Sequence, residues 1–490
     1  MSKIYIYNTL GRKKEEFKPL KKGKVSFYHC GPTVYWTQHI GNLRGMTCAD
    51  FVVRTLKYFD YEVTQVRNYT DVGHLTSDED EGEDKIEKGA KREGKTPREI
   101  ANKYIDIFEL DIAELNLSEP DYKPRATEHI EEMIAMVKTL LDKGYAYTTN
   151  LAVYFDISKK EDYTKLSGQD LEKLLSGAGK GEIADPRKRN PADFVLWFFK
   201  AGVHENALQT WKSPFQSKLV AEGEGFPGWH LECSAMSKKY LGDTIDIHMG
   251  GIEHIPVHHT NEIAQSECAN GVKFVNYWLH NEHLLEKEKK IAKSEGASLT
   301  LSVIKDQGYH PLDLRFFFLQ AQYRSKQNFT WEALSAARKG REHLNNQVRE
   351  LGTEKGEINQ DFKEKFKIAL GDDFNTCSAL SVVQDLLKSE LEKKDKLATI
   401  LDFDKVLGLK LTSCILKAET GEFKLSGSKM RPILTTKEIN KDEEVLGLIK
   451  ERERAREEKD FEKADRLREE IEGQGYLIED TAEGVRVSKK

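Results

Sequence analysis

Apolar positions near the N-terminus follow spacings that predict a β-α-β unit. Residues 24–35, KVSFYHCGPTVY, are β-like, and apolar side chains recur at helical spacing over residues 41–59. Residues 61–73, YEVTQVRNYTDVG, predict a second strand that ends in a polar turn. This rhythm is typical of an α/β protein with a parallel sheet, whose ligands bind at the carboxyl ends of the strands.

The pattern changes over residues 118–228, where a helix at 128–147 precedes short strands and a Gly/Lys-rich loop at 175–194. We interpret this region as an insertion between the halves of a split, Rossmann-type nucleotide fold. The charged residues 78–95 are expected to form a mobile surface segment. Sheet-like sequence resumes at 228–236 and 246–265.

Beyond about residue 310 the pattern is almost entirely helical. A linker near residues 415–435 precedes a charged helical tail at 443–475 and a short β-like end. The expected fold is therefore a split α/β domain with an inserted connective domain, a helical bundle and a small C-terminal domain.

Size and composition narrow the class of protein. A chain of 490 residues suggests two to four domains, and its net charge of −6 offers no global basic field, although local patches can still bind RNA. The N-terminus lacks the apolar core of a signal peptide, and no apolar run approaches the ~20 residues that span a bilayer. We expect a cytoplasmic protein without a membrane segment.

The six cysteines are scattered, and none forms a CxxC pair. In a reducing cytosol, disulfides are not expected, and most of these cysteines are interpreted as small buried side chains. A metal site would have to be assembled from distant segments.

The turn His39-Ile40-Gly41-Asn42 has features of a nucleotide site. Gly41 would let an adenine or ribose approach the backbone, and the following helix would offer its first amides to phosphates. His39 would then hydrogen-bond a phosphoryl oxygen. The alternative is a histidine that merely begins a helix.

A second candidate lies in residues 286–300, EKEKKIAKSEGASLT. Lys290 and Lys293 would neutralise a departing pyrophosphate if this loop closes over ATP. The alternative is a solvated run of charges.

A metal site is the third candidate. His258 and Glu262 are at i,i+4, so on a helix they would share one face, while His259 and Glu262 at i,i+3 would serve almost as well. With Cys30 and Cys233, either histidine completes a four-ligand zinc set. Spacing does not choose between the two, and buried structural roles are the alternative for every member.

Taken together, the segments HCGPTVYWTQHIGN, GWHLECSAM, GGIEHIPVHHTNE and KIAKS occur in the order typical of class I aminoacyl-tRNA synthetases. The sequence closely resembles the cysteinyl-tRNA synthetases over nearly its whole length, including NYTDVG, KRNPADFVLW, YRSKQNFTWEAL, GDDFNTCSAL and the tail. HIGN stands where that family has HIGH, and KIAKS where it has KMSKS.

The resemblance implies a function and a set of site residues. Cysteine would be activated by ATP as cysteinyl-adenylate and transferred to the terminal ribose of tRNA(Cys), with one Zn²⁺ per chain selecting cysteine over serine and Mg²⁺ accompanying ATP. The zinc ligands carry over to Cys30, Cys233, His258 and Glu262, which prefers His258 over His259. The catalytic residues would be His39, Asn42, Lys290 and Lys293. The ATP site would include these four together with Gly41 and Ser294. The cysteine pocket would be lined by Gly31, Thr70 and Trp229.

The resemblance also implies a domain plan and a monomer. The catalytic domain would comprise residues 1–117 and 229–310, and the connective insertion 118–228. A stem-contact region at 311–350, a tRNA-binding bundle at 351–415 and an anticodon-binding domain at 430–490 would follow.

Several positions depart from the family pattern. Asn42 is not a cation, Ile291 and Ala292 replace Met and Ser of KMSKS, and Val487 stands where a tryptophan is common. Glu253, Thr260 and Cys377 replace residues that are usually Asp, Glu and Pro.

Two rival functions remain. A cysteine ligase of the mycothiol pathway shares the zinc site but lacks the tail at 420–490, and a non-catalytic zinc-containing RNA-binding protein needs no nucleotide loop.

Overall fold

The computed structural model describes residues 2–72, 84–176, 185–286, 289–290, 299–413, 415, 420–423, 433–436, 443–457, 460–481 and 484–489. They form two compact units. The first comprises Met1–Lys339, Gln360–Asp385 and Lys405–Leu409, and the second comprises Gly340–Asn359, Leu386–Asp404 and Lys410–Lys490.

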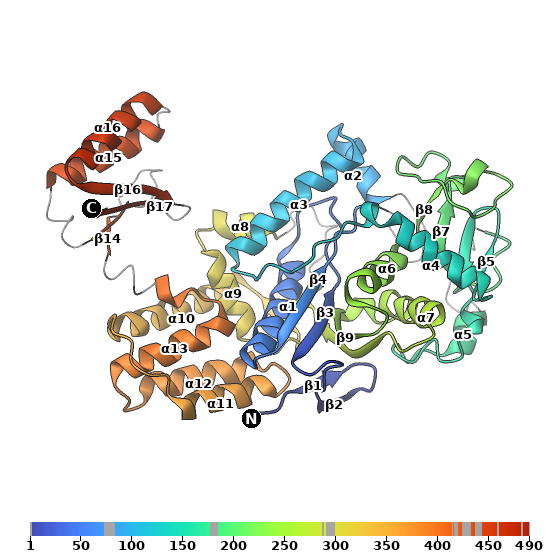
Figure 1. Ribbon diagram of the computed structural model, residues 1–490, viewed down its shortest axis with the longest axis horizontal. Coiled ribbons are helices and arrows are strands. Elements are labelled where there is room, and N and C mark those ends of the chain that lie inside the picture. The colour runs from blue at the N-terminus through green and yellow to red at the C-terminus, as the bar shows by residue number, and fades with distance from the viewer. Residues whose placement is uncertain are drawn as a thin grey trace. The chain divides into compact units, whose positions relative to one another are not determined.

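A parallel sheet forms the centre of the first unit. Its strands are β3 (Lys24–His29), β4 (Glu62–Arg67), β9 (Ile245–Gly251) and β10 (Val275–Asn281), in the order β10-β9-β3-β4 with every neighbouring pair parallel. From β3, the chain crosses to β4 on one side, while β9 lies on the other side (Figure 1). The α/β class predicted from the sequence is confirmed.

Helix α1 (Ile40–Tyr58) makes the crossover from β3 to β4, and its residues are mostly buried. Val52 and Leu56 pack with Val25 and Phe27 of β3 in one apolar cluster. Burial on nearly all sides explains why this segment is apolar at so many positions.

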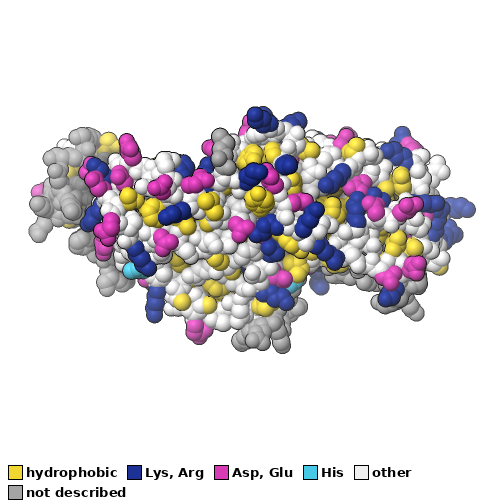
Figure 2. All heavy atoms as spheres, turned by 90° about the horizontal axis from the view of Figure 1, so that it is seen from below, with side chains coloured by type: hydrophobic (Ala, Val, Ile, Leu, Met, Phe, Trp, Pro, Cys, Tyr) yellow, Lys and Arg dark blue, Asp and Glu magenta, His cyan; other side chains and the backbone are white. Residues whose placement is uncertain are grey.

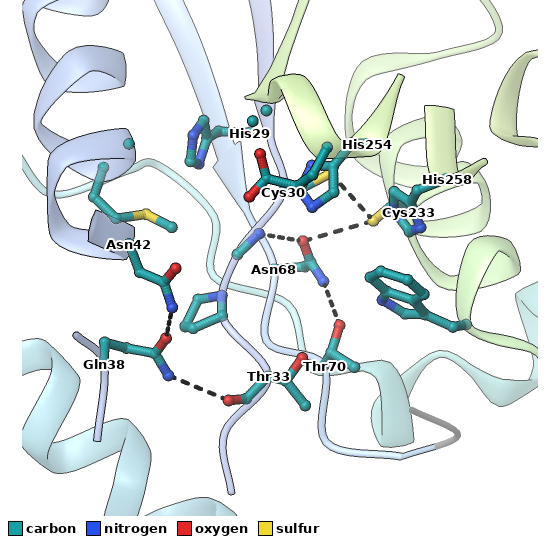
Figure 3. A pocket seen from close by; sticks show the side chains of 18 of the residues that line it. His29, Cys30, Thr33, Gln38, Asn42, Asn68, Thr70, Cys233, His254 and His258 are labelled. Atoms are coloured by element: carbon teal, nitrogen blue, oxygen red, sulfur yellow. Dashed lines mark hydrogen bonds between the residues drawn. The ribbon is translucent and has the colours of Figure 1, made fainter. Parts of the chain in front are cut away.

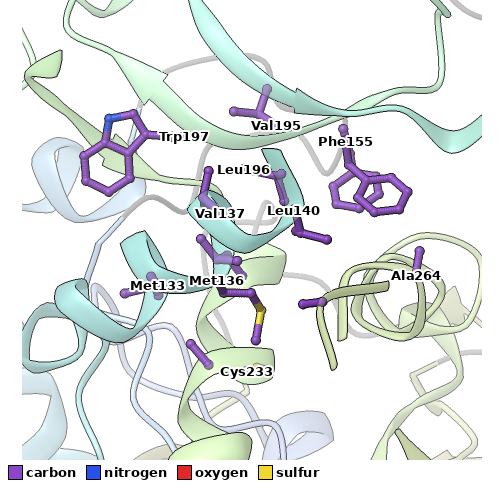
Figure 4. Close-up of a cluster of buried hydrophobic side chains, with 14 of the residues drawn as sticks. Met133, Met136, Val137, Leu140, Phe155, Val195, Leu196, Trp197, Cys233 and Ala264 are labelled. Carbon is purple, nitrogen blue, oxygen red and sulfur yellow. The ribbon is translucent and has the colours of Figure 1, made fainter. Parts of the chain in front are cut away.

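The inserted region has a sheet of its own. Strands β5 (Ala146–Thr148), β6 (Ala152–Phe155), β7 (Phe194–Phe199) and β8 (Gly225–Pro227) are antiparallel, in the order β5-β6-β7-β8. Met133, Met136 and Leu140 of α4 (Ile130–Asp142) pack in the same core as Phe155 and Cys233 (Figure 4). This core therefore supports the helix that carries Cys233.

Local predictions were wrong in several places. Residues 246–265 are a strand only as far as Gly251 and are helical from His258, and the linker expected near residues 415–435 contains two strands, Thr420–Phe423 and Ile433–Thr436. Residues 228–236 are not sheet-like, because they begin helix α6 (Trp229–Leu241), whose side chains from His230 to Ser237 are all buried. Part of the segment expected to be mobile, residues 78–95, is helix α2 (Lys85–Glu93), with Ile86 and Ala90 buried. Tertiary burial overrides local polarity in α2 and α6. Residues 78–83 lie outside the described residues.

The first unit contains further helices and strands. They are β1 (Tyr5–Asn8), β2 (Lys13–Glu16), α3 (Pro97–Glu114), α5 (Leu171–Ser176), α7 (His258–Asn270), β11 (Leu284–Glu286), β12 (Lys289–Lys290), α8 (Leu301–Asp306), α9 (Pro311–Leu319), β13 (Gln327–Phe329), α11 (Gln360–Gly371) and most of α12 (Thr376–Lys388). Helix α10 (Trp331–Glu350) and helix α13 (Lys393–Leu407) contribute residues to both units. The mostly helical pattern predicted beyond residue 310 is confirmed.

The second unit ends in a small α/β fold. Helices α15 (Glu443–Glu457) and α16 (Phe461–Gly473) accompany strands β14 (Thr420–Phe423), β15 (Ile433–Thr436), β16 (Tyr476–Thr481) and β17 (Gly484–Lys489). The charged tail is therefore two helices rather than one, and Asp460 caps the second. Val487 is buried with Ile449 and Ile478, so this departure from the family pattern is a core residue.

The surface is mixed in charge. Figure 2 shows one face on which basic and acidic side chains are interspersed, as the small net charge suggests. None of the described helices combines the length and apolarity that crossing a membrane requires.

Candidate active site and metal centre

A cavity of about 430 Å³ opens at the carboxyl ends of the parallel strands. Its wall contains the residues that follow or end these strands: Cys30 and Gly31 after β3, Asn68 and Thr70 after β4, Gly250 and Gly251 of β9, and Asn281 of β10. This edge of the sheet is where the β-α-β pattern predicts a ligand.

The cavity has two chemically different ends (Figure 3). Cys30, Cys233 and His258 lie together at one end, and Gln38 and Asn42 lie at the other. A single ligand can therefore meet sulfur and imidazole at one end and a helix N-terminus at the other.

Four potential metal ligands converge beside the first end. The Cys30 Sγ lies 3.8 Å from the Cys233 Sγ and 3.9 Å from the Glu262 Oε1. His258 Nε2 is 2.9 Å from the same carboxylate oxygen, and the four ligand atoms lie within 4.8 Å of one another. Two thiols, an imidazole and a carboxylate are donors that Zn²⁺ binds tetrahedrally, so the residues fit this ion.

Sequence spacing left His258 and His259 as equal candidates, and the structure separates them by position. Cys30, His248, His259 and Glu262 form a second group of possible ligands, with His259 Nε2 at 3.4 Å from the Cys30 Sγ. His258 lines the cavity, whereas His248 and His259 are not among its lining residues. The set with His258 is thus the one that faces the cavity.

Histidines behind the cluster hold the ligand side chains in place. His230 Nδ1 lies 2.9 Å from His258 Nδ1, and His248 Nε2 lies 2.8 Å from Glu262 Oε2. Such outer partners fix the ring orientation and the tautomer of metal ligands.

The cluster has strongly perturbed pKa values. The hydrogen bond with Cys30 lowers the pKa of Cys233 to about 6 against the effect of burial, and burial raises the pKa of Cys30 well above its usual value. Burial opposes ionisation of both Glu262 and His258. The attraction of His248 and His258 outweighs burial at Glu262 and lowers its pKa to about 2. The attraction of Glu262 and Cys233 outweighs burial at His258 and raises its pKa to about 10. The shifts at Cys233 and Glu262 favour the ionised thiolate and carboxylate, which are the forms of these side chains that bind a metal ion.

Asn68 joins the residues expected to line a cysteine pocket. Its Oδ1 accepts a hydrogen bond from the Gly31 N–H at 2.9 Å, and its Nδ2 donates to Thr70 Oγ1 at 3.3 Å. A Cβ on Gly31 would lie 1.6 Å from the Asn68 carbonyl oxygen, so only glycine fits there. Thr70 Oγ1 donates to Glu232 Oε2 at 2.8 Å, and the Trp229 ring lies 4.2 Å from that of His258.

At the other end, His39 begins helix α1 and also faces the cavity. It is the N-cap of α1, where its Nδ1 accepts from the Asn42 N–H at 3.2 Å, and it also lines the cavity. Asn42 Nδ2 donates to Gln38 Oε1 at 2.5 Å. Gly41 lies in the cavity wall between them.

The structure describes only part of residues 286–300, the segment that contains Lys290 and Lys293. Lys290 belongs to β12, which pairs with β11, but its side chain, Lys293 and Ser294 lie outside the described residues.

Four contributors to the site were missed from the sequence. Asn68 lies within NYTDVG, Glu232 within GWHLECSAM, and Lys85 in the segment expected to be mobile, whereas His230 had no spacing partner. Polar residues directly after a predicted strand would have indicated Asn68, but nothing local marks the other three.

Comparison with known proteins agrees with this geometry. A family model described as "tRNA synthetases class I (C) catalytic domain" matches residues 16–339, and one described as "Cysteinyl-tRNA ligase anticodon binding domain" matches residues 441–487. A solved methionyl-tRNA synthetase of Mycobacterium tuberculosis has a TM-score of 0.53 at 14% identity, over 81% of this chain and 91% of that one, which supports the fold.

Curated relatives match from end to end. The cysteine–tRNA ligase of Treponema denticola is 44% identical over 506 residues, covering 98% of each chain. Cysteine–tRNA ligase 1 of Burkholderia lata is 42% identical, covering 99% of this chain and 96% of that one, and the cysteine–tRNA ligase of Chlorobaculum tepidum is 41% identical over the full length of both. The chain therefore belongs to the cysteinyl-tRNA synthetase family of class I aminoacyl-tRNA synthetases.

Proposed function

We propose that this chain activates cysteine with ATP and attaches it to tRNA(Cys), using Zn²⁺ to select the amino acid. The observation that carries the proposal is the single cavity shared by Cys30, Cys233 and His258 at one end and His39, Gly41 and Asn42 at the other. Such a cavity can hold the thiol of cysteine and the phosphates of ATP at the same time.

The metal would be held by Cys30, Cys233, His258 and Glu262, one ion per chain. When bound there, zinc supplies a Lewis acid that favours a thiol over a hydroxyl, which distinguishes cysteine from serine. A purely steric pocket separates such near-isosteres by only ~10²-fold.

Gly31, Thr70 and Trp229 would shape the rest of the cysteine pocket. The missing side chain of Gly31 leaves room for the backbone carbonyl of Asn68, and Asn68 with Glu232 holds the Thr70 hydroxyl in one orientation. Fixed polar groups of this kind place the carboxylate for attack on the α-phosphorus of ATP.

His39, Gly41 and Asn42 would bind ATP at the start of α1, where backbone amides favour phosphate. Asn42 would contribute a neutral hydrogen bond. Lys290 and Lys293, with Ser294, would stabilise the departing pyrophosphate that Mg²⁺ accompanies. The cysteine carboxylate oxygen would form a bond to the α-phosphorus of ATP as the bond from that phosphorus to pyrophosphate breaks, so pyrophosphate carries the charge away. No residue of the protein forms a covalent bond in this step.

The regions beyond residue 310 would bind tRNA. Residues 118–228 form the connective insertion between the catalytic segments 1–117 and 229–310, residues 311–350 contact the stem, and residues 351–415 form a tRNA-binding bundle. Residues 430–490 would read the anticodon, and the enzyme would act as a monomer.

The test is ATP–pyrophosphate exchange on zinc-loaded protein with each of the twenty amino acids, followed by charging of tRNA(Cys). We expect exchange with cysteine alone, lost on chelation and restored by zinc. Cysteine-dependent exchange without tRNA charging would favour the mycothiol-type ligase, and no exchange with any amino acid would favour a non-catalytic RNA-binding protein.

A further inference from the structure

A lysine that the sequence analysis did not consider enters the cavity from helix α2. Lys85 is the first residue of α2 and lines the cavity. Among the described lining residues it is the sole lysine or arginine. We propose that Lys85 binds a phosphate group during aminoacylation, an inference that rests on the proposed function.

Helix α2 is fastened to the loop that leads into the HIGN turn. The Arg92 guanidinium lies 4.1 Å from the centre of the Trp36 ring, and Arg92 donates to the Tyr35 carbonyl oxygen at 3.3 Å. A Cβ on Gly89 would lie 3.3 Å from the same oxygen, so α2 and this loop are in close contact. Tyr35 itself lines the cavity, which ties the position of α2 to the nucleotide end.

The other side of α2 is fastened to the inserted region. The buried Glu87 accepts a hydrogen bond from the Leu208 N–H at 2.6 Å, and Ile86 is fully buried. At the N-terminus, Asp84 accepts from the amides of Ile86 and Glu87 at 2.7 and 3.0 Å. These contacts fix the backbone on either side of Lys85, so the position from which its side chain reaches the cavity is also fixed.

Charge explains what this lysine would bind. Glu253 is the sole carboxylate among the described residues that line the cavity, and Asn42 supplies no charge where the family motif has histidine. The substrates bring the triphosphate of ATP and the phosphodiester of the terminal tRNA nucleotide. An ammonium group offers charge-assisted hydrogen bonds to either, and it stabilises charge without forming a covalent bond.

Two phosphate sources share this chemistry, and two reactions distinguish them. ATP–pyrophosphate exchange needs no tRNA, whereas single-turnover transfer from preformed cysteinyl-adenylate needs no ATP. Lys85→Gln should lower the rate of one or both by about 10-fold or more, the size expected for losing a charged hydrogen bond. A loss in exchange assigns Lys85 to ATP, and a loss in transfer alone assigns it to tRNA.

Lys88→Gln is the matched control, because Lys88 is exposed one turn along the same helix and does not line the cavity. Its rates should stay within about twofold of the unmodified protein, and Lys85→Arg should recover part of the lost rate because it keeps the charge. Circular dichroism and the melting temperature confirm that each variant folds.

The proposal is overturned if Lys85→Gln and Lys88→Gln give the same rates in both reactions, or if Lys85→Arg loses as much as Lys85→Gln. Failure of the unmodified protein to exchange with cysteine would instead count against the proposed function. The two failures are thus separable.

Discussion

At the residue scale, Asn68 shows how one amide can join the parts of a site. Its Oδ1 accepts a hydrogen bond from the Gly31 N–H, and its Nδ2 donates one to Thr70 Oγ1. The Cys233 Sγ lies 3.9 Å from the same Oδ1. The side chain is almost completely buried, so water does not replace these bonds. Asn68 is therefore a positioning residue for Cys233 of the proposed metal site and for Gly31 and Thr70 of the proposed cysteine pocket.

We expect Asn68→Ala to raise the KM for cysteine about 10-fold or more. The substitution leaves the backbone N–H of Gly31 without its hydrogen-bond acceptor, and such a loss costs about 1–3 kcal/mol. The KM for ATP should change much less. Gln38→Ala is the comparison, since Gln38 contacts Asn42 at the opposite end of the cavity and should affect ATP instead. Steady-state exchange kinetics measure both constants, and equal effects on the two substrates would contradict this assignment.

Gly31→Ala provides a steric test at the same place. The added methyl group would overlap the Asn68 carbonyl, so the backbone of β3 or β4 must move. We expect a loss of stability of about 1–3 kcal/mol, as for an overpacked core, together with loss of cysteine activation. Denaturant unfolding and exchange measure the two effects, and a variant with unchanged unfolding free energy would refute the close contact.

At the element scale, the sequence predicts regular elements well and tertiary exceptions poorly. The β3-α1-β4 unit follows from apolar spacing and is confirmed. The helix that carries His258 and Glu262 does not follow from it, because residues 246–265 were expected to be sheet-like. Helices α2 and α6 were missed because their small, polar and aromatic residues are buried by contacts with distant segments. The proposed zinc set combines three separate segments, namely the end of β3, helix α6 and helix α7. Local spacing suggested only the pairing of a histidine with Glu262, and it did not choose between His258 and His259.

Helix α3 contains a buried carboxyl group, Asp111, whose charged form is disfavoured in the folded protein. Burial, with Glu114 nearby, raises the pKa of Asp111 to about 7, and its Oδ2 has no hydrogen-bond partner in the described part of the chain. A carboxyl whose pKa is raised by folding stabilises the protein below pH ~4 and loses that contribution as the pH rises through about 7.

Asp111→Asn should therefore raise the free energy of unfolding by about 1–2 kcal/mol above pH 7. This is less than the full pKa shift implies, because solvent screens part of the charge on Asp111. The gain should shrink towards pH 4. Denaturant unfolding at several pH values checks this, with the exposed Asp106→Asn on the same helix as control. A gain that is constant with pH would rule out titration of Asp111 as its cause.

At the scale of the whole molecule, a buried arginine ties the first unit together. Arg315 of α9 donates to Asp50 of α1 at 2.7 Å, to the Leu407 carbonyl at 2.7 Å, and to the carbonyls of Leu115 and Asn116 at 3.1 Å each. Asp50 also accepts from Arg54 at 2.8 Å. This network joins elements that are hundreds of residues apart in the sequence, and no local pattern predicts it.

Arg315→Met should destabilise the first unit by about 3–5 kcal/mol, because it leaves Asp50 buried with less compensation. Arg349→Met, at an exposed position, should change the unfolding free energy by less than about 0.5 kcal/mol. Unfolding followed by intrinsic fluorescence compares them. Equal stabilities would show that the network is energetically neutral.

The central claim is that one zinc ion, held by Cys30, Cys233, His258 and Glu262, selects cysteine. The most direct measurement is the zinc content and cysteine-dependent exchange of His258→Gln beside His259→Gln, since both histidines are buried next to Glu262. We expect His258→Gln to lose zinc and exchange together, and His259→Gln to retain one zinc per chain. The reverse pattern, or full zinc content with normal exchange in His258→Gln, would contradict the claim.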